Sequence, residues 1–378
     1  MPPRLPTTAP VLSGFSYLRP LGSGGFADVY LYEQDLPRRQ VAVKVLPAGL
    51  QGTDVRRMFN AEADVLARLS AHPSILTVYQ ASVSADGRPY IVMEYCPASY
   101  GERYRSERLP VPEVLQVGIK IASALETAHR AGLMHRDVKP SNILITEFGA
   151  PVLADFGIAA SLTGHRAERL FAMSVPWSAP EVAGEHTAGS VASEVWALGA
   201  TVYSLLTGRS PFERDGAGQN TAEHLKRRIG RAVYTPTGRR DVPQELETVL
   251  ATALQRNPQT RQASAREFAE ALQSVQRSLG LVQTPLEIAP DSWAAGGRAV
   301  DFADSGLRGP VRASVPYTSA RKAPATDGPS ARSAHSDSSG LVEPGTKVRS
   351  SWPWILTGLA ATALLVILAV LLHLWRVV

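Results

Sequence analysis

The hydrophobic pattern of the 378-residue chain changes its period near residue 95, and this change constrains the fold more than any other feature. Before that point, short β-branched or alternating runs predict strands at 17–21, 28–32, 40–46 and 90–95, with one helix at 54–70. After it, apolar residues recur at helical spacing over 113–132, 191–206, 243–254 and 264–279. The last of these helices opens with the capping-box pair Ser264 and Glu267. A strand-rich part followed by a helix-rich part predicts an α+β fold with two lobes.

The C-terminal region has a different character. Residues 352–375 contain no Asp, Glu, Lys or Arg, and most of them are Leu, Ala, Val or Ile. At about 1.5 Å per residue, a helix of this length spans a hydrocarbon core of roughly 30 Å. Tryptophans at 352, 354 and 375 are typical of the two interfaces. We therefore predict a transmembrane helix at 352–375, inserted in the lipid bilayer.

The flanking charges predict the orientation of this helix. Lys347 and Arg349 precede the span, whereas Arg376 alone follows it. Because positive charge stays on the cytoplasmic side, we expect a single-pass protein of the plasma membrane with a cytoplasmic N-terminal part. Residues 376–378 then form a short external tail.

Composition separates the remaining regions and excludes several functions. Residues 279–350 are rich in Pro, Ser, Gly and Ala without a sustained period, which predicts a disordered juxtamembrane linker. Residues 1–14 are proline-rich, lack the apolar core of a signal peptide and are expected to be flexible. The net charge of +5 comes from interspersed acids and bases, so no nucleic-acid partner is expected. A single cysteine, Cys96, excludes an intrachain disulfide and a zinc cluster.

Two features near the N-terminus suit a bound phosphate. A glycine-rich segment, 22–29, lies between two predicted strands, and glycines let the backbone approach phosphates closely. No Gly-Lys-Ser/Thr follows it, which excludes a Walker-type loop. Lys44 is one of only six lysines in an arginine-rich chain and lies within an apolar strand. Its compact ammonium could hold phosphates, with Glu62 as the natural acidic partner.

The stretch 135–142 is the most informative part of the sequence. It places Asp137, Lys139 and Asn142 within six residues, and Asp155 follows after a short predicted strand pair. Phosphoryl transfer requires one carboxylate that accepts a hydroxyl proton and another that holds Mg²⁺. The pattern therefore predicts a phosphotransferase.

On these motifs, residues 15–278 resemble the eukaryotic-like (Hanks-type) protein kinases, and in particular the membrane-anchored serine/threonine kinases of actinobacterial type. The resemblance implies the bilobal protein-kinase fold, with ATP between a β-rich and an α-rich lobe. It also implies Mg²⁺ as cofactor, with Mn²⁺ as an alternative, and Ser/Thr hydroxyls of proteins as acceptors. Autophosphorylation is expected as well.

The resemblance also implies individual roles. Asp137 is the catalytic base and Lys139 steadies the γ-phosphate, while Asn142 and Asp155 hold the metal. Lys44 contacts the α- and β-phosphates and pairs with Glu62. The implied nucleotide-binding residues are Leu21, Gly22, Ser23, Gly24, Gly25, Val29, Ala42, Lys44, Glu94, Cys96 and Leu144.

The resemblance to the protein kinases also implies roles for other residues. Met93 is expected beside the adenine site, where Glu94 and Cys96 present backbone groups to the base. This role of Cys96 is favoured over that of a redox switch. Glu181, in Ala-Pro-Glu, is expected to pair with Arg261. Ser174 and Trp177 occupy the positions of a substrate-docking loop.

The sequence departs from the family pattern at two positions. Ala27 replaces the third glycine of the loop, and Glu194 stands where the family has an aspartate that accepts backbone N–H groups. The extra methylene of Glu194 predicts some loss of preorganisation. In the activation segment, either Thr163 is the autophosphorylation site or Glu168 supplies a fixed negative charge to Arg136. His129 lacks metal-ligand spacing and receives no function.

Two other functions remain as alternatives to an active protein kinase. One is a nucleotide-binding pseudokinase that acts as a membrane scaffold, and Glu194 is its only support. The other is a small-molecule phosphotransferase, against which Lys139 and the Ala-Pro-Glu segment argue. Gly358 and Thr362, four residues apart in the predicted span, add the hypothesis of a homodimer.

Overall fold

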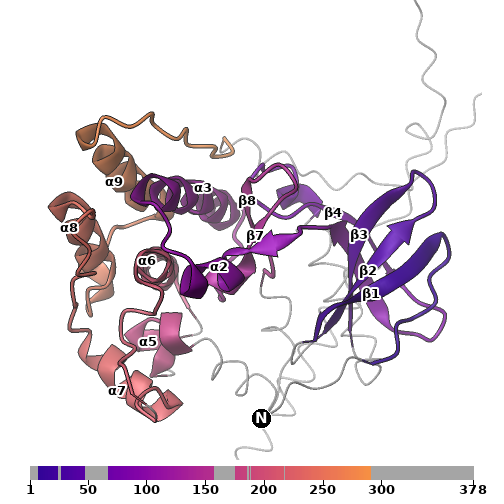
Figure 1. Ribbon diagram of the computed structural model, residues 1–378, viewed down its shortest axis with the longest axis horizontal. Coiled ribbons are helices and arrows are strands. Elements are labelled where there is room, and N and C mark those ends of the chain that lie inside the picture. Colours follow the sequence, from indigo (N-terminus) through magenta and orange to yellow (C-terminus); the bar gives the residue numbers. More distant parts are fainter. Residues whose placement is uncertain are drawn as a thin grey trace, which may run out of the picture. The chain divides into compact units, whose positions relative to one another are not determined.

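The computed structural model describes residues 7–23, 27–46, 67–156, 175–184, 187, 189–216 and 218–290. All of them belong to one compact unit, in which the strands gather on one side and most helices on the other (Figure 1). The two-lobed α+β architecture is thus present. No helix within these described ranges has the length and apolarity needed to cross a bilayer, and the predicted span 352–375 lies outside them.

The larger sheet is antiparallel, with strand order β1-β2-β3-β5-β4. Its strands are β1 (Phe15–Ser23), β2 (Asp28–Gln34), β3 (Arg39–Val45), β4 (Val78–Val83) and β5 (Pro89–Glu94). Period-two alternation sends Val41 and Val43 to one face, where they pack with Tyr30 and Tyr32. Ala42 points to the other face, beside Met93, with which it pairs in register. This second face is turned toward the candidate site.

The helical lobe is built around two buried helices, α3 (Val111–Arg130) and α6 (Val191–Thr207). The other helices are α2 (Tyr100–Ser106), α5 (Pro180–Ala183), α7 (Ala222–Arg231), α8 (Gln244–Ala253) and α9 (Ala265–Ser278). Gly118 lets α3 approach α9 closely, because a Cβ there would lie 2.7 Å from Leu272 Cδ1. Gly199 does the same for α6 and α8, where a Cβ would meet that of Ala253 at 2.7 Å.

A small sheet joins the two lobes, in the order β6-β7-β8. Its strands are β6 (Ala98–Ser99), β7 (Ile143–Ile145) and β8 (Pro151–Leu153), and the short helix η1 (Pro140–Asn142) directly precedes β7. Leu76, which precedes β4, donates its backbone N–H to Leu153 O at 3.0 Å. The predicted catalytic segment 135–142 and Asp155 therefore flank a sheet that is hydrogen-bonded to the strand-rich lobe.

The predicted helices 113–132, 191–206, 243–254 and 264–279 correspond to α3, α6, α8 and α9. At α9, Ser264 accepts a hydrogen bond from Glu267 N–H as predicted, but the Glu267 carboxylate bonds Ala263 N–H instead of the cap residue. Most of the predicted helix 54–70 lies outside the described residues. Strand β4 and helices α2 and α7 were not predicted.

The folded domain extends beyond both of its predicted boundaries. Residues 7–14 were expected to be flexible, but Leu12 is buried and Pro10 O accepts a 2.5 Å hydrogen bond from the Tyr32 hydroxyl. The predicted linker starts at 279, yet residues 281–290 pack along α3. There Glu287 pairs with Lys120 at 3.0 Å. Apolar and ionic contacts hold both short segments on the folded domain, although their composition predicted flexible chain. Residues 291–378 lie outside the described part.

Candidate active site

Three predicted catalytic residues lie together around η1. Lys139 Nζ is 2.8 Å from Asp137 Oδ2. Asn142 donates from its amide nitrogen to the backbone oxygen of Asp137 at 2.7 Å and to Asp137 Oδ2 at 3.0 Å. Because both bonds use the nitrogen, the amide oxygen of Asn142 is the atom that could serve as a metal ligand. The segment thus presents a carboxylate, an ammonium and an amide oxygen within a few ångströms.

Lys44 and Asp155 meet although they are 111 residues apart in the chain. The Lys44 Nζ atom on β3 lies 2.6 Å from Asp155 Oδ1, just after β8. Register places Lys44 opposite Val29, the last residue of the glycine-rich segment. The Lys44 ammonium holds the pKa of the Asp155 carboxyl below its usual range, so this group is an anion at neutral pH. About half of the Asp155 side chain is exposed, which leaves an oxygen accessible to a cation.

His135 connects the two carboxylate segments, a role that the sequence did not reveal. The ring is completely buried. Its Nδ1 accepts Asp137 N–H at 3.2 Å, and its Nε2 lies 2.8 Å from Ala154 O, next to Asp155. A backbone N–H can only donate and a carbonyl only accept, so the proton is on Nε2. Burial lowers the pKa of His135, which keeps the ring in this neutral form.

Glu194 makes the backbone contact expected of the shorter aspartate. One carboxylate oxygen accepts Arg136 N–H at 2.5 Å, which fixes a residue whose φ of 67° lies in the left-handed region. The other oxygen lies 2.6 Å from His129 Nε2. The extra methylene is therefore accommodated, and His129, to which the sequence assigned no function, is a structural partner of Glu194. This pair is buried beneath the catalytic segment, with side-chain exposures of 4% and 6%.

The predicted adenine site is an apolar cluster between the sheets. Ala42, Leu76, Met93, Val152 and Ala154 are buried there, and Leu21, Val29, Cys96 and Leu144 pack against them. Five predicted nucleotide-binding residues thus share one surface. Burial raises the pKa of the Cys96 thiol to about 12, which argues against a redox switch. Gly22, Ser23 and Glu94 lie at the ends of β1 and β5, whereas Gly24, Gly25 and Glu62 fall outside the described residues.

The predicted substrate-docking segment lies next to Asp137. A small pocket there is lined in part by Trp177 and Ser178, and the Trp177 indole donates to Ser204 Oγ at 3.0 Å. The predicted pair of Glu181 and Arg261 is present, with two bonds of 2.7 and 2.9 Å. Ser174, Thr163 and Glu168 lie outside the described residues.

The chemistry of these groups fits a metal-bound triphosphate. Asp155 and the amide oxygen of Asn142 are the hard oxygen ligands that Mg²⁺ prefers, and Mg²⁺ commonly takes only one or two protein ligands together with substrate phosphates. Among the described residues, no cluster of three or more His, Cys, Asp or Glu side chains could hold a metal alone. An ammonium, two carboxylates and an apolar adenine site define a nucleotide-dependent phosphotransferase.

Comparison with known proteins agrees with this geometry. The model of the protein kinase domain matches residues 15–274, and the chain belongs to the protein kinase family. Members of this family use ATP and Mg²⁺. The relatives found are bacterial serine/threonine kinases, which matches the resemblance seen in the motifs.

Three relatives illustrate the range of similarity. The serine/threonine-protein kinase PknK of Mycobacterium tuberculosis is 40% identical over 272 residues, which cover 71% of this chain and 24% of PknK. PknF of the same species is 36% identical over 276 residues, or 69% of this chain and 56% of PknF. PrkC of Bacillus subtilis is 33% identical over 263 residues, or 67% and 39%. The chain therefore matches between about a quarter and about half of the length of these relatives.

Proposed function

We propose that this chain is a serine/threonine protein kinase that transfers the γ-phosphate of ATP to protein hydroxyls. The proposal depends on two groups of residues near the apolar adenine site. Lys44 and Asp155 form an ion pair, and the second group consists of Asp137, Lys139 and Asn142. The relatives with 33–40% identity are all named serine/threonine-protein kinases.

The proposed transfer assigns each proton and bond to a group of the site. The acceptor oxygen forms a bond to the γ-phosphorus, the bond to the bridging oxygen of ADP breaks, and the Asp137 carboxylate takes the hydroxyl proton. Lys139, 2.8 Å from Asp137, lies where it can offset negative charge that develops on the transferred group. Asn142 and Asp155 would hold Mg²⁺, which would supply positive charge to neutralise the phosphates.

The test compares two substitutions of aspartate by asparagine in the full-length chain. Asp137→Asn removes the base without changing its size, whereas Asp215→Asn alters a side chain that is 97% exposed. With labelled ATP, Mg²⁺ and a generic basic protein, we expect Asp137→Asn to lower phosphate incorporation by about 10²- to 10⁴-fold. Asp215→Asn should remain within twofold of the wild type. Incorporation that persists in Asp137→Asn would defeat the mechanism.

The geometry weakens the pseudokinase alternative. That alternative relied on Glu194, whose carboxylate nevertheless accepts the Arg136 N–H, as the family aspartate is expected to do. A small-molecule phosphotransferase is disfavoured by the docking segment around Trp177 and Glu181, which suits a protein substrate.

We propose further that residues 352–375 anchor the kinase in the plasma membrane, with the catalytic domain in the cytoplasm. The support is the uncharged run with tryptophans at its ends and the basic residues before it. Fractionation of cells that express the full chain or residues 1–350 tests this proposal. The full chain should resist extraction with carbonate, and the truncated chain should not. Equal extraction of both would contradict the anchor.

The homodimer is a separate proposal. Small residues four apart, Gly358 and Thr362, allow close approach of two membrane helices. Crosslinking in membranes should trap dimers that Gly358→Leu reduces, and a purely monomeric pattern in the wild type would end the idea.

A further inference from the structure

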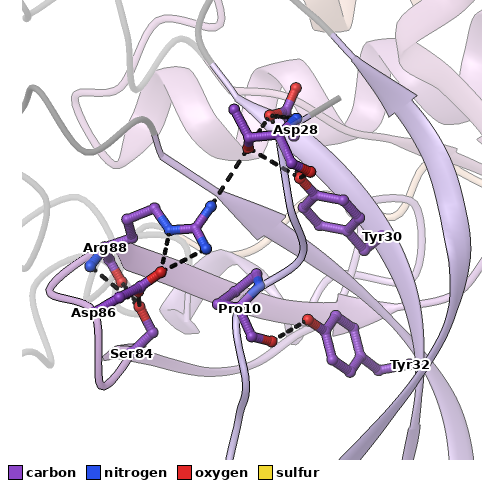
Figure 2. A network of polar contacts seen from close by, with 8 residues as sticks. Pro10, Asp28, Tyr30, Tyr32, Ser84, Asp86 and Arg88 are labelled. Carbon is purple, nitrogen blue, oxygen red and sulfur yellow. Dashed lines mark hydrogen bonds and ion pairs between the residues drawn. The ribbon is translucent and has the colours of Figure 1, made fainter. Parts of the chain in front are cut away.

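The segment before the first strand is tied to the beginning of β2 by one buried carboxylate. Thr7 donates its backbone N–H at 3.0 Å and its hydroxyl at 2.6 Å to Asp28 Oδ2. Asp28 is only 2% exposed. Figure 2 shows Asp28 and Tyr30 on the strand, facing the segment that carries Pro10. These bonds link residues that are 21 positions apart in the chain.

The second oxygen of the same carboxylate reaches the other end of the glycine-rich segment. Ser23, the last residue of β1, donates its hydroxyl to Asp28 Oδ1 at 2.7 Å. Ser23 and Asp28 are also partners in the register of β1 and β2. One oxygen of Asp28 therefore links the two ends of the glycine-rich segment 22–29, here called the phosphate-binding loop. The other oxygen binds the N-terminal segment.

Other contacts hold the N-terminal segment in place. The hydroxyls of Tyr30 and Tyr32 donate to the backbone oxygens of Thr7 and Pro10 at 2.6 and 2.5 Å. Arg88 pairs with Asp86 in the turn between β4 and β5 (Figure 2). It also approaches Thr7 Oγ1 at 3.4 Å. Strand β2 and the turn between β4 and β5 thus both contact this segment.

We propose that residues 7–12, here called the N-terminal strap, position the phosphate-binding loop, with Thr7 and Asp28 as positioning residues for ATP. A glycine-rich loop has little conformational preference of its own, so its geometry depends on what holds its ends. A buried carboxylate needs hydrogen-bond donors on both oxygens, and here they come from the strap and from the loop. Without the Thr7 hydroxyl, the backbone N–H of Thr7 remains the donor from the strap, so Asp28 is held less firmly and its bond to Ser23 weakens.

The proposal rests on the proposed kinase function only for its kinetic readout. Nucleotide affinity measured with a fluorescent ATP analogue reports on the loop even in a chain that transfers no phosphate. The strap is remote in sequence from the catalytic segment 135–142, so the proposal predicts an effect on ATP binding and little effect on turnover at saturating ATP.

Three single variants of the full-length chain test the strap. Thr7→Val removes the hydroxyl at constant shape, Thr7→Ser retains it, and Thr8→Val makes the same change at an exposed neighbour for which no hydrogen bond is found among the described residues. We expect Thr7→Val to raise KM for ATP and the dissociation constant of the analogue about three- to tenfold, the range for one ordinary hydrogen bond. The kcat should stay within twofold, and Thr7→Ser and Thr8→Val should resemble the wild type.

A double-mutant cycle makes the test specific to the carboxylate. Asp28→Asn should weaken ATP binding as Thr7→Val does, and the double variant should be no weaker than the worse single variant, because both changes break the same link. The proposal is overturned if Thr7→Val binds ATP within twofold of the wild type. It is equally overturned if Thr8→Val or Thr7→Ser weakens binding as much as Thr7→Val, or if the two effects simply add.

Discussion

Arg261 donates every N–H of its guanidinium group to an acceptor, and all five bonds are partly buried, which makes Arg261→Lys an informative substitution. Two bonds go to the carboxylate of Glu181 at 2.7 and 2.9 Å. The other three go to the backbone oxygens of Ala192, Gln255 and Arg256 at 2.9, 2.8 and 3.2 Å. The Arg261 side chain is fully buried, so no water reaches its N–H groups and the protein must supply their partners.

The expected loss of stability follows from the number of N–H donors in each side chain. A lysine ammonium keeps the charge but has three N–H groups, so at least two of the five acceptors lose their partner. At about 1 kcal/mol for each partly buried acceptor that loses its partner, Arg261→Lys should lower the free energy of unfolding by about 2 kcal/mol. That is a large fraction of the stability of a typical domain.

The assay is urea unfolding of the full-length chain in detergent, followed by near-ultraviolet circular dichroism. Arg227→Lys is the matched control, because Arg227 is 57% exposed and pairs with the exposed Glu223 at 2.9 Å. The control should change the unfolding free energy by less than about 0.5 kcal/mol. If Arg261→Lys also stays below about 0.5 kcal/mol at an unchanged m value, the donor count does not govern this site.

Two further predictions concern titration. His72 accepts Ser74 N–H on Nδ1, lies 2.5 Å from Glu287 O through Nε2, and has a pKa lowered chiefly by burial, so it is neutral in the folded state. In the unfolded chain, the His72 ring takes up a proton below about pH 6.5, so the free energy of unfolding should fall by up to about 1.4 kcal/mol per pH unit as the pH decreases. Unfolding of the wild type and of His72→Gln at pH 7.5 and 5.5 tests this, and the variant should lose less stability between the two pH values. An equal slope in His72→Gln would contradict this reasoning. Burial raises the pKa of the Cys96 thiol to about 12. At pH 7.5, iodoacetamide should therefore modify Cys96 in the native chain about 10³-fold more slowly than in the urea-unfolded chain. Mass spectrometry measures both rates, and equal rates would contradict the burial argument.

Secondary structure was predictable where the hydrophobic period was strong. Helices α3, α6, α8 and α9 bury a continuous apolar face, and the periodicity located each of them to within a few residues. Strand β4 escaped prediction because all of its residues but the first are exposed, so it shows no alternation. Helix α7 escaped for a similar reason, since it buries only Leu225 and Ile229.

The domain boundaries were less predictable because they depend on long-range contacts. Residues 7–12 fall in the part that the sequence predicted to be flexible, and their bonds to Asp28, Tyr30 and Tyr32 explain why they lie on the sheet. Residues 281–290 look like the start of a linker. Their attachment depends on Lys120 of α3, 167 positions from Glu287, and on the hydrogen bonds of Thr284 to Gln276 in α9.

The chemical groups of the active site were determined by the sequence alone. Asp137, Lys139, Asn142 and Asp155 stand at spacings that phosphoryl transfer requires, and three of them lie within one short segment whose local backbone brings them together. Local spacing controls local geometry, because a few residues of chain leave few arrangements open.

Only the tertiary structure decided how distant groups combine. The 2.6 Å contact between Lys44 and Asp155, the support of Arg136 by Glu194, and the strap that binds Asp28 all join residues from different elements. Such contacts leave no periodic trace in the sequence, because they arise from packing of helices and sheets whose partners are set by the whole core.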